Sequence, residues 1–185
     1  MRDVARRAGV SHQAPYHYFH DRAGIFAVIA EEGFDHLTHA MDLALDESRS
    51  PAAACFDAYL RIAREYPGHF RVMFRRDICG ISAHEPTRES ADSAYNALER
   101  MVDRILERPV DADEKAVWAS LMWSLAHGFA ALLSDGPLAA KLSDGTDIEK
   151  HIADFNRLAT TMVENQARLV SENPRRGFVT GSTTF

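Results

Sequence analysis

A run of hydrogen-bonding side chains near the N-terminus has the residue types that recognise DNA. The run contains Ser11, His12, Gln13, Tyr16, His17 and Tyr18. Glutamine can form two hydrogen bonds with adenine in the major groove, and His12 can also reach base edges. Serine and tyrosine hydroxyls and His17 suit phosphate oxygens. Arg22 follows at the expected start of the next helix, where the helix N-terminus also suits a phosphate. The predicted chemistry of this stretch is non-covalent contact with the major groove of double-stranded DNA.

The charge distribution favours the same partner, although the total charge does not. The 185 residues carry a formal net charge of −6, which is unfavourable for binding a polyanion. The first 22 residues, however, contain four arginines and two aspartates, a balance of +2, so the remaining residues carry −8. We expect a basic end that meets DNA and an acidic remainder that suits a cytoplasmic protein.

Two short helices separated by a tight turn must position these side chains. Residues 2–8 have apolar residues at helical spacing, and Gly9 supplies the positive φ that commonly ends a helix. Ser11 is a suitable N-cap for a second helix over residues 12–18, and Pro15 is tolerated within its first turn. This order is the helix-turn-helix arrangement, in which the second helix enters the major groove.

The stretch RDVARRAGVSHQAPYHYFHDRAGIFAVIAEEGF resembles the DNA-binding region of the TetR family of bacterial transcriptional regulators. The positions that coincide with the family pattern are Ala8, Gly9, Val10, Ser11, Tyr16, Phe19 and the pair Asp21–Arg22. In the C-terminal half, Trp123, His127 and Gly128 are similar to a Trp-His-Gly signature of one type of TetR regulatory domain.

This resemblance implies a homodimeric transcriptional regulator, typically a repressor that a ligand releases from DNA. The helices expected at about 113–133 and 147–170 would form a four-helix bundle with those of a second copy, as two-fold DNA half-sites require. The ligand is expected to be small and apolar or aromatic. Its predicted contacts are Phe70, Phe74, Tyr95, Met101, Trp123 and His127. Two alternatives stay open for His127: a core histidine bonded to a neighbouring helix, or a donor that faces the ligand.

Helical periodicity continues along the rest of the chain, and no segment shows the alternation of a strand. Asp21 is the expected cap of a helix over residues 22–47. Further helices are expected from Ser50 to Pro67, over 69–78, from beyond Pro86 to Arg108, over about 113–133 and over 147–170. The predicted fold class is all-α. The predicted domains are a partial DNA-binding domain at 1–25, a helical regulatory and dimerisation domain at 26–172, and a mobile tail at 173–185.

The sequence offers little for catalysis, metal binding or a membrane. No uncharged apolar stretch is expected to be long enough for a membrane span, and no signal peptide is visible. The histidine pairs His17–His20 and His36–His39 lack a further Cys or carboxylate at metal-ligand spacing. No nucleophile–base pair or Gly-rich phosphate loop is apparent. We therefore expect no enzyme activity, no metal and no cofactor, and two reduced structural cysteines.

One departure from the family pattern concerns the start of the chain. Members of the family have a basic arm and a first helix ahead of the motif, and this helix covers apolar side chains of the small domain. The sequence lacks such a helix, so the chain is expected to be N-terminally truncated, with its true start upstream of Met1. The alternative function is a helical ligand-binding and dimerisation module that does not bind DNA. Salt-dependent DNA binding separates the two, because phosphate contacts release counterions.

Overall fold

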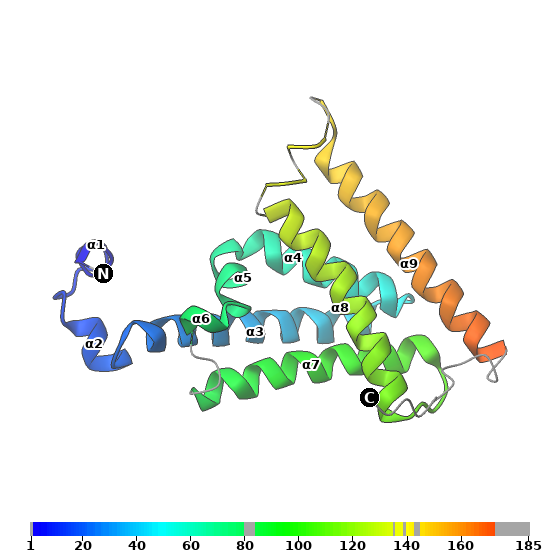
Figure 1. Cartoon of the computed structure of the whole chain (residues 1–185), viewed down its shortest axis with the longest axis horizontal. Helices are drawn as coiled ribbons and strands as arrows, with labels where there is room; N and C mark the ends of the chain where they lie inside the picture. Colours follow the sequence, from blue (N-terminus) through cyan, green and yellow to red (C-terminus); the bar gives the residue numbers. More distant parts are fainter. Residues whose placement is uncertain (1, 80–83, 135, 139, 143–144, 173–185) are drawn as a thin grey trace, which may run out of the picture. The chain divides into compact units, whose positions relative to one another are not determined.

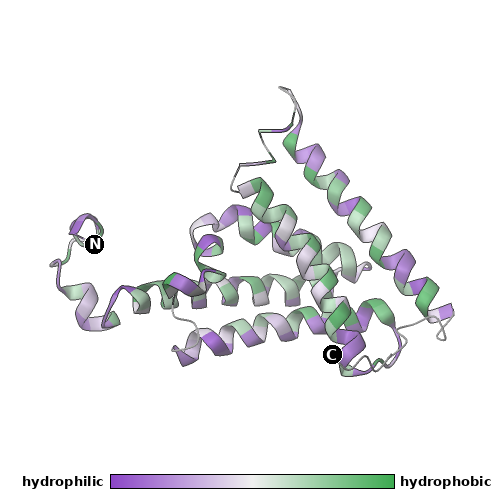
Figure 2. Ribbon diagram, viewed as in Figure 1, coloured by the Kyte–Doolittle hydropathy of each residue, from purple (hydrophilic) through white to green (hydrophobic). Residues whose placement is uncertain are grey.

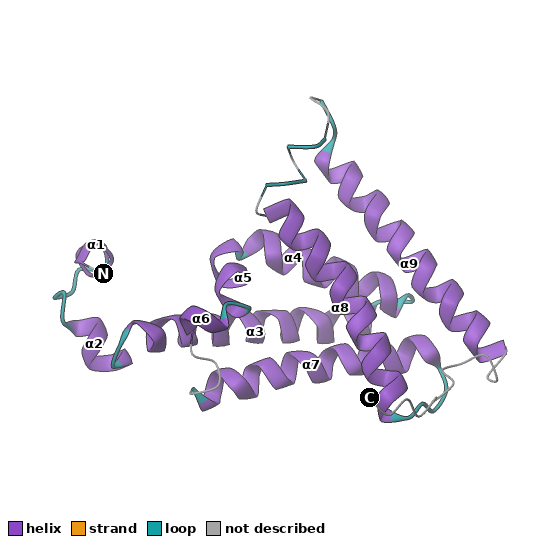
Figure 3. Cartoon of the chain, in the orientation of Figure 1, coloured by secondary structure: helices purple, strands orange, loops and turns teal. Residues whose placement is uncertain are grey.

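Helices make up the fold in the part of the chain that the structure describes. The computed structural model describes residues 2–79, 84–134, 136–138, 140–142 and 145–172 (Figure 1). Its helices are α1 (Arg2–Arg7), α2 (Ala14–Phe19), α3 (Arg22–Glu47), α4 (Pro51–Glu65), α5 (Pro67–Met73), α6 (Arg76–Cys79), α7 (Glu85–Leu106), α8 (Ala112–Ser134) and α9 (Ile148–Glu172). No strand occurs within these ranges (Figure 3), which confirms the predicted all-α fold class. The predicted tail at 173–185 lies outside the described residues.

The described residues form two compact units, each built from two separate segments of the chain. The first unit falls within Met1–His39 and Ile62–Ala94, and the second within Ala40–Arg61 and Tyr95–Phe185. The helices α3, α4 and α7 therefore each contribute residues to both units. The predicted domain division after residue 25 stays a prediction.

Side-chain caps define the starts of the long helices, as the sequence predicts. The Asp21 carboxylate accepts a hydrogen bond of 2.8 Å from the backbone amide of Gly24, in the first turn of α3. Asp111 accepts one of 2.8 Å from the amide of Glu114 in the first turn of α8, and so fills the role that the sequence left open between Asp111 and Asp113. α3 has the limits predicted for it, because its cap is a local signal.

The second helix of the motif starts later than predicted. α2 begins at Ala14 rather than at residue 12. The Ser11 hydroxyl accepts a hydrogen bond of 3.2 Å from the Ala14 amide, and the Ser11 carbonyl accepts another of 3.1 Å from the same group. These bonds hold residues 11–13 in a turn, and Gln13 takes the N-cap position without a side-chain cap.

The single helix predicted over residues 69–78 is wrong, because the structure has two short helices there. Pro67, which was expected to end the preceding helix, is the first residue of α5, where the missing amide hydrogen costs little. α5 ends at Met73, and α6 begins at Arg76. A Cβ placed on Gly33 of α3 would lie 2.6 Å from the Met73 sulfur, so this glycine lets α5 pack closely on α3.

The second unit buries one face of α9. The buried side chains of this helix are Ile152, Asn156, Ala159, Val163, Ala167 and Val170. Figure 2 shows apolar and polar residues alternating along it. Phe155 stacks on Phe129 of α8, with 3.8 Å between ring centroids and 5° between the ring planes. The Asn156 side-chain amide donates to the Asp57 carboxylate of α4. Apolar packing and polar contacts therefore both hold α9 in its unit.

α8 corrects one expectation about membranes. By length and composition this helix could cross a membrane, since its most apolar window has a mean hydropathy of 1.4. The prediction that no uncharged apolar stretch is long enough for a membrane span is wrong. Residues 116–134 contain no charged side chain, and their few polar side chains leave the mean hydropathy high. In the second unit α8 contributes to the core with Trp118, Ala119, Met122, Ala126, Phe129 and Ala130.

Candidate functional site

The turn between α1 and α2 depends on a glycine in the first unit. Gly9 has a φ of +71°, in the left-handed region that glycine adopts without strain. The amides of Gly9 and Val10 donate to the carbonyls of Arg6 (3.2 Å) and Ala5 (3.0 Å), and these bonds end α1. Ala5 is buried. The structure thus contains a helix, a glycine turn and a second helix in the predicted order.

The predicted DNA contacts all lie on the surface of the first unit. Exposed side chains belong to Ser11, His12, Gln13, Tyr16, His17, Tyr18 and Arg22. Tyr18 is the most exposed large apolar side chain of the described residues, at 76 %. Its ring meets the His17 ring edge-on, with 5.7 Å between centroids. The Arg22 guanidinium lies 5.1 Å from the centre of the Phe26 ring. These side chains are accessible to a large partner, as contact with a DNA groove requires.

The six predicted ligand contacts are divided between the two units. Phe70 and Phe74 belong to the first unit, where their rings meet edge-on with 5.6 Å between centroids. The other four, which are Tyr95, Met101, Trp123 and His127, belong to the second unit. Met101 is fully buried there, whereas Trp123 is 39 % exposed. A single site formed by all six stays a prediction.

Tyr59 joins two of these residues inside the second unit. Tyr59 lies on α4 and is 3 % exposed. Its hydroxyl lies 2.8 Å from Nδ1 of His127 on α8, and Nε1 of Trp123 donates to the same hydroxyl at 3.2 Å. α8 can present both partners to one tyrosine because residues four apart lie on one face of a helix. Of the two alternatives for His127, the structure shows the bond to a neighbouring helix.

The chemistry of the groups fixes one role in this network. The Trp123 indole can only donate, so the Tyr59 oxygen accepts from it. The Tyr59 hydroxyl can donate to or accept from Nδ1 of His127, according to which ring nitrogen of the histidine carries the proton. Burial lowers the pKa of His127 and raises the pKa of Tyr59, so both groups are uncharged at neutral pH.

The sequence prediction missed Tyr59, which is the centre of this network. Its position in an apolar helix stripe looks like ordinary core, and its partners are more than sixty residues away along the chain. The available signal was chemical, because a buried tyrosine hydroxyl and a buried histidine both need hydrogen-bond partners. Cys55, one turn earlier on α4, is a free thiol whose pKa burial raises to about 12. Among the described residues, no three His, Cys, Asp or Glu side chains are grouped to hold a metal ion.

A family model described as tetracyclin repressor-like, C-terminal domain matches residues 52–155, which is more than half of the chain. The chain belongs to this family. The TetR-like match runs from α4 to the first half of α9, and it contains Tyr59, Trp123 and His127.

One solved structure is similar to most of the TetR-like chain. It is described as a protein with unknown function from Rhodococcus sp. RHA1, and it superposes with a TM-score of 0.68 at 26 % sequence identity. The similarity covers 89 % of this chain and 82 % of that one. No curated protein matches the chain.

Proposed function

We propose that this TetR-like protein is a DNA-binding transcriptional regulator, a repressor that acts as a homodimer and leaves DNA when a small ligand binds. One observation carries the proposal. The polar side chains of the exposed α2 follow a left-handed glycine turn, in a chain of the TetR-like family. Exposure and hydrogen-bonding capacity are what a helix needs to read base edges in the major groove.

Binding to the DNA beside its own gene tests this proposal. Fluorescence anisotropy with a duplex from that region should show an affinity that falls steeply as salt rises, because phosphate contacts release counterions. Gln13→Ala should weaken binding to this duplex by about tenfold and binding to an unrelated duplex much less. Arg22→Gln should reduce the salt slope by about 1.

The matched control is Arg168→Gln, which removes an exposed arginine of α9 and should leave the slope unchanged. A flat salt dependence with no preference between duplexes would contradict the regulator. That result would favour the alternative, a helical ligand-binding and dimerisation module that does not bind DNA.

Exposed apolar side chains on the last two helices support the dimer. They are Val117, Leu121 and Leu132 on α8, with Leu158, Met162 and Leu169 on α9, and each is between 42 % and 60 % exposed. Each set recurs at helical spacing and so forms a stripe on its helix. We call these six residues the apolar stripes. A Cβ placed on Gly128 of α8 would meet nothing within 4 Å, so a second helix has room to approach there.

The ligand half of the proposal rests on the polar network of the second unit. Ligand pockets in helical proteins are mostly apolar with a few fixed polar groups, and Tyr59, Trp123 and His127 are such groups beside buried apolar side chains. In the proposed mechanism, a ligand among residues 56–129 shifts α3 and moves the two α2 helices away from the spacing of successive major grooves, about 34 Å.

A thermal-shift screen of small apolar and aromatic compounds tests the ligand half. At least one compound should raise the melting temperature of the wild type and raise it less for Trp123→Phe. A compound so found should also weaken the DNA complex. A screen without any stabilising compound would contradict ligand control.

A further inference from the structure

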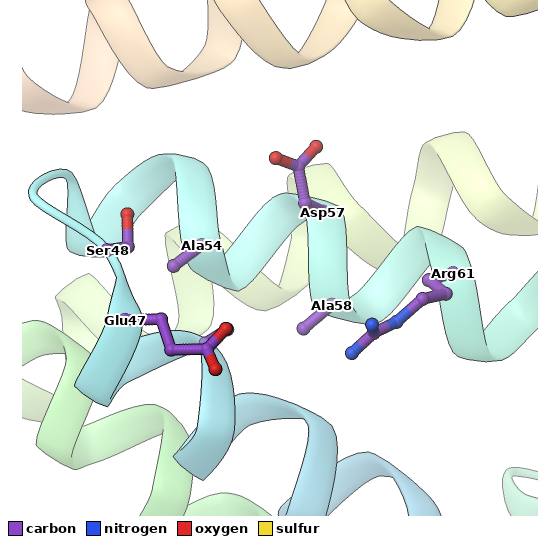
Figure 4. Close-up of a pocket in the computed structure, with 7 residues that line it drawn as sticks. Glu47, Ser48, Ala54, Asp57, Ala58 and Arg61 are labelled. Carbon is purple, nitrogen blue, oxygen red and sulfur yellow. The ribbon is translucent and has the colours of Figure 1, made fainter.

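A small polar pocket lies in the second unit, between the C-terminal end of α3 and α4 (Figure 4). Its volume is about 340 Å³, and its lining residues are Ala44, Glu47, Ser48, Ala54, Asp57, Ala58 and Arg61. None of them is a predicted DNA contact or a predicted contact of the apolar ligand. We propose that this pocket binds a small zwitterion, a molecule in which a short carbon chain joins one ammonium group to one carboxylate.

Alanines produce the hollow. Ala44 of α3 and Ala54 and Ala58 of α4 line the space, and the last two are buried, at 5 % and 2 % exposure. Their methyl groups leave open a volume that longer side chains would fill, and they give the pocket an apolar floor. The volume is near the lower limit of ligand pockets, so it suits a few methylene groups rather than a large molecule.

One carboxylate and one guanidinium border this floor. In Figure 4 the side chains of Glu47 and Arg61 point toward one another across the pocket, whereas Asp57 points away from it toward α9. The Asp57 carboxylate accepts a hydrogen bond from Asn156 and is already used. Glu47 and Arg61 have no side-chain hydrogen bond or ion pair with the rest of the described chain. A ligand carboxylate matches the planar fork of Arg61, and a ligand ammonium matches Glu47.

The end of α3 favours a cation on the Glu47 side of the pocket. The last carbonyls of a helix lack partners within it and carry partial negative charge. The last turn of α3 contains no basic residue, and its final residues are Asp46 and Glu47. Two carboxylates at the negative end of a helix are electrostatically unfavourable, and a cation beside them would offset this repulsion. A ligand ammonium at Glu47 would supply that cation.

The turn at this end of the pocket is held in place before any ligand binds. The Ser48 hydroxyl donates to the Ser50 carbonyl (3.0 Å) and accepts from the Ser50 amide (3.1 Å). The Ser50 hydroxyl donates to Glu164 of α9 at 2.6 Å and accepts from the Ala53 amide at 3.2 Å. A wall that is already ordered lowers the entropy cost of binding a small molecule.

Calorimetric titration of the full chain with glycine, β-alanine, 4-aminobutanoate and 6-aminohexanoate tests the proposal. We expect saturable binding with an optimal chain length, because Glu47 and Arg61 extend from set positions on α3 and α4. Butylamine and butanoate each carry one half of the charge pattern and should bind at least about tenfold more weakly than 4-aminobutanoate. No saturable binding in the series, or equal binding of the half-ligands, would overturn the proposal.

Variants assign the binding to this pocket. Glu47→Gln and Arg61→Gln should each weaken the best ligand by about tenfold or more. Glu172→Gln and Arg49→Gln remove the same charges at exposed positions that do not line the pocket, and should have little effect. Ala44→Leu should fill the hollow and abolish binding, with circular dichroism showing that helix content is kept. Equal losses in the control variants would overturn the assignment. DNA binding is independent of this outcome, because the pocket shares no residue with the DNA contacts.

Discussion

The hydroxyl oxygen of Tyr59 on α4 lies 2.8 Å from Nδ1 of His127 on α8, and it also accepts a hydrogen bond from Trp123. This arrangement links two helices of the second unit through the hydroxyl of a buried tyrosine. A hydroxyl has one hydrogen to donate and two lone pairs that accept, so the Tyr59 oxygen can bond both neighbours at once. The network therefore makes the stability of the second unit sensitive to one oxygen atom.

Tyr59→Phe should lower the free energy of unfolding by about 1 kcal/mol, because Trp123 and His127 lose this partner while keeping some access to water. Urea unfolding followed by circular dichroism measures the change, with an unchanged m-value. Tyr95→Phe is the matched control. The Tyr95 hydroxyl has no hydrogen bond to the described residues, so its removal should matter by less than about 0.5 kcal/mol. Equal losses of unfolding free energy in the two variants would show that the hydrogen bonds of Tyr59 do not contribute to stability.

Acid should weaken the folded state through His127. Burial lowers its pKa below the ordinary 6.5, so the unfolded chain takes up this proton at a higher pH than the folded chain. The contribution to stability is complete above pH 6.5 and is lost as the pH falls through that value toward the lower pKa of the folded state.

Urea titrations of the wild type and His127→Gln at about pH 7.5 and about pH 5.5 isolate this effect, because the other histidines titrate in both proteins. The wild type should lose more free energy of unfolding on acidification than the variant does. Parallel losses would show that His127 makes no contribution to the pH dependence.

Gly24→Ala should destabilise the junction of α2 and α3. A Cβ at this position would lie 2.2 Å from the Phe19 carbonyl oxygen, a backbone atom that cannot rotate away. We expect a loss of about 1–3 kcal/mol in the free energy of unfolding and weaker DNA binding. Gly68→Ala is the same chemical change in open space within α5, where it should be neutral or slightly stabilising. A Gly24→Ala variant with an unchanged free energy of unfolding would contradict this close contact.

The double variant Leu121→Lys with Met162→Lys should convert the proposed dimer into a monomer, because it places two charges in the apolar stripes. Size-exclusion chromatography with light scattering measures the molar mass. Leu43→Lys on α3 introduces a charge at a comparably exposed leucine outside the stripes and should leave the dimer intact. A wild-type monomer at all concentrations, or a dimer that survives the double variant, would contradict the proposed assembly.

Local signals allowed much of the fold to be predicted from the sequence. Asp21 and Gly9 each act within a few residues, and the structure has the cap at the start of α3 and the left-handed turn after α1 where those residues imply them. The division into α5 and α6 could not be predicted in the same way. Apolar residues continue across it, and the close packing of Met73 on Gly33 joins positions forty residues apart.

The candidate sites show the same limit. Residue types alone indicated an exposed, polar α2, because reading a groove requires hydrogen-bonding side chains on the surface. The Tyr59 network and the pocket at Glu47 and Arg61 depend on which helix faces are brought together. Helical periodicity shows which face of each helix is apolar, but not which other helix packs against that face. Neither the Tyr59 network nor the pocket between the alanines could therefore be predicted from the sequence.

Because α3, α4 and α7 each contribute residues to both compact units, neither unit corresponds to a continuous piece of the gene. A recombination event with one crossover between α1 and α7 would join part of the first unit to a foreign remainder. Exchange of the first unit as a whole among relatives of this protein would therefore need three crossovers, close to residues 39, 61 and 94.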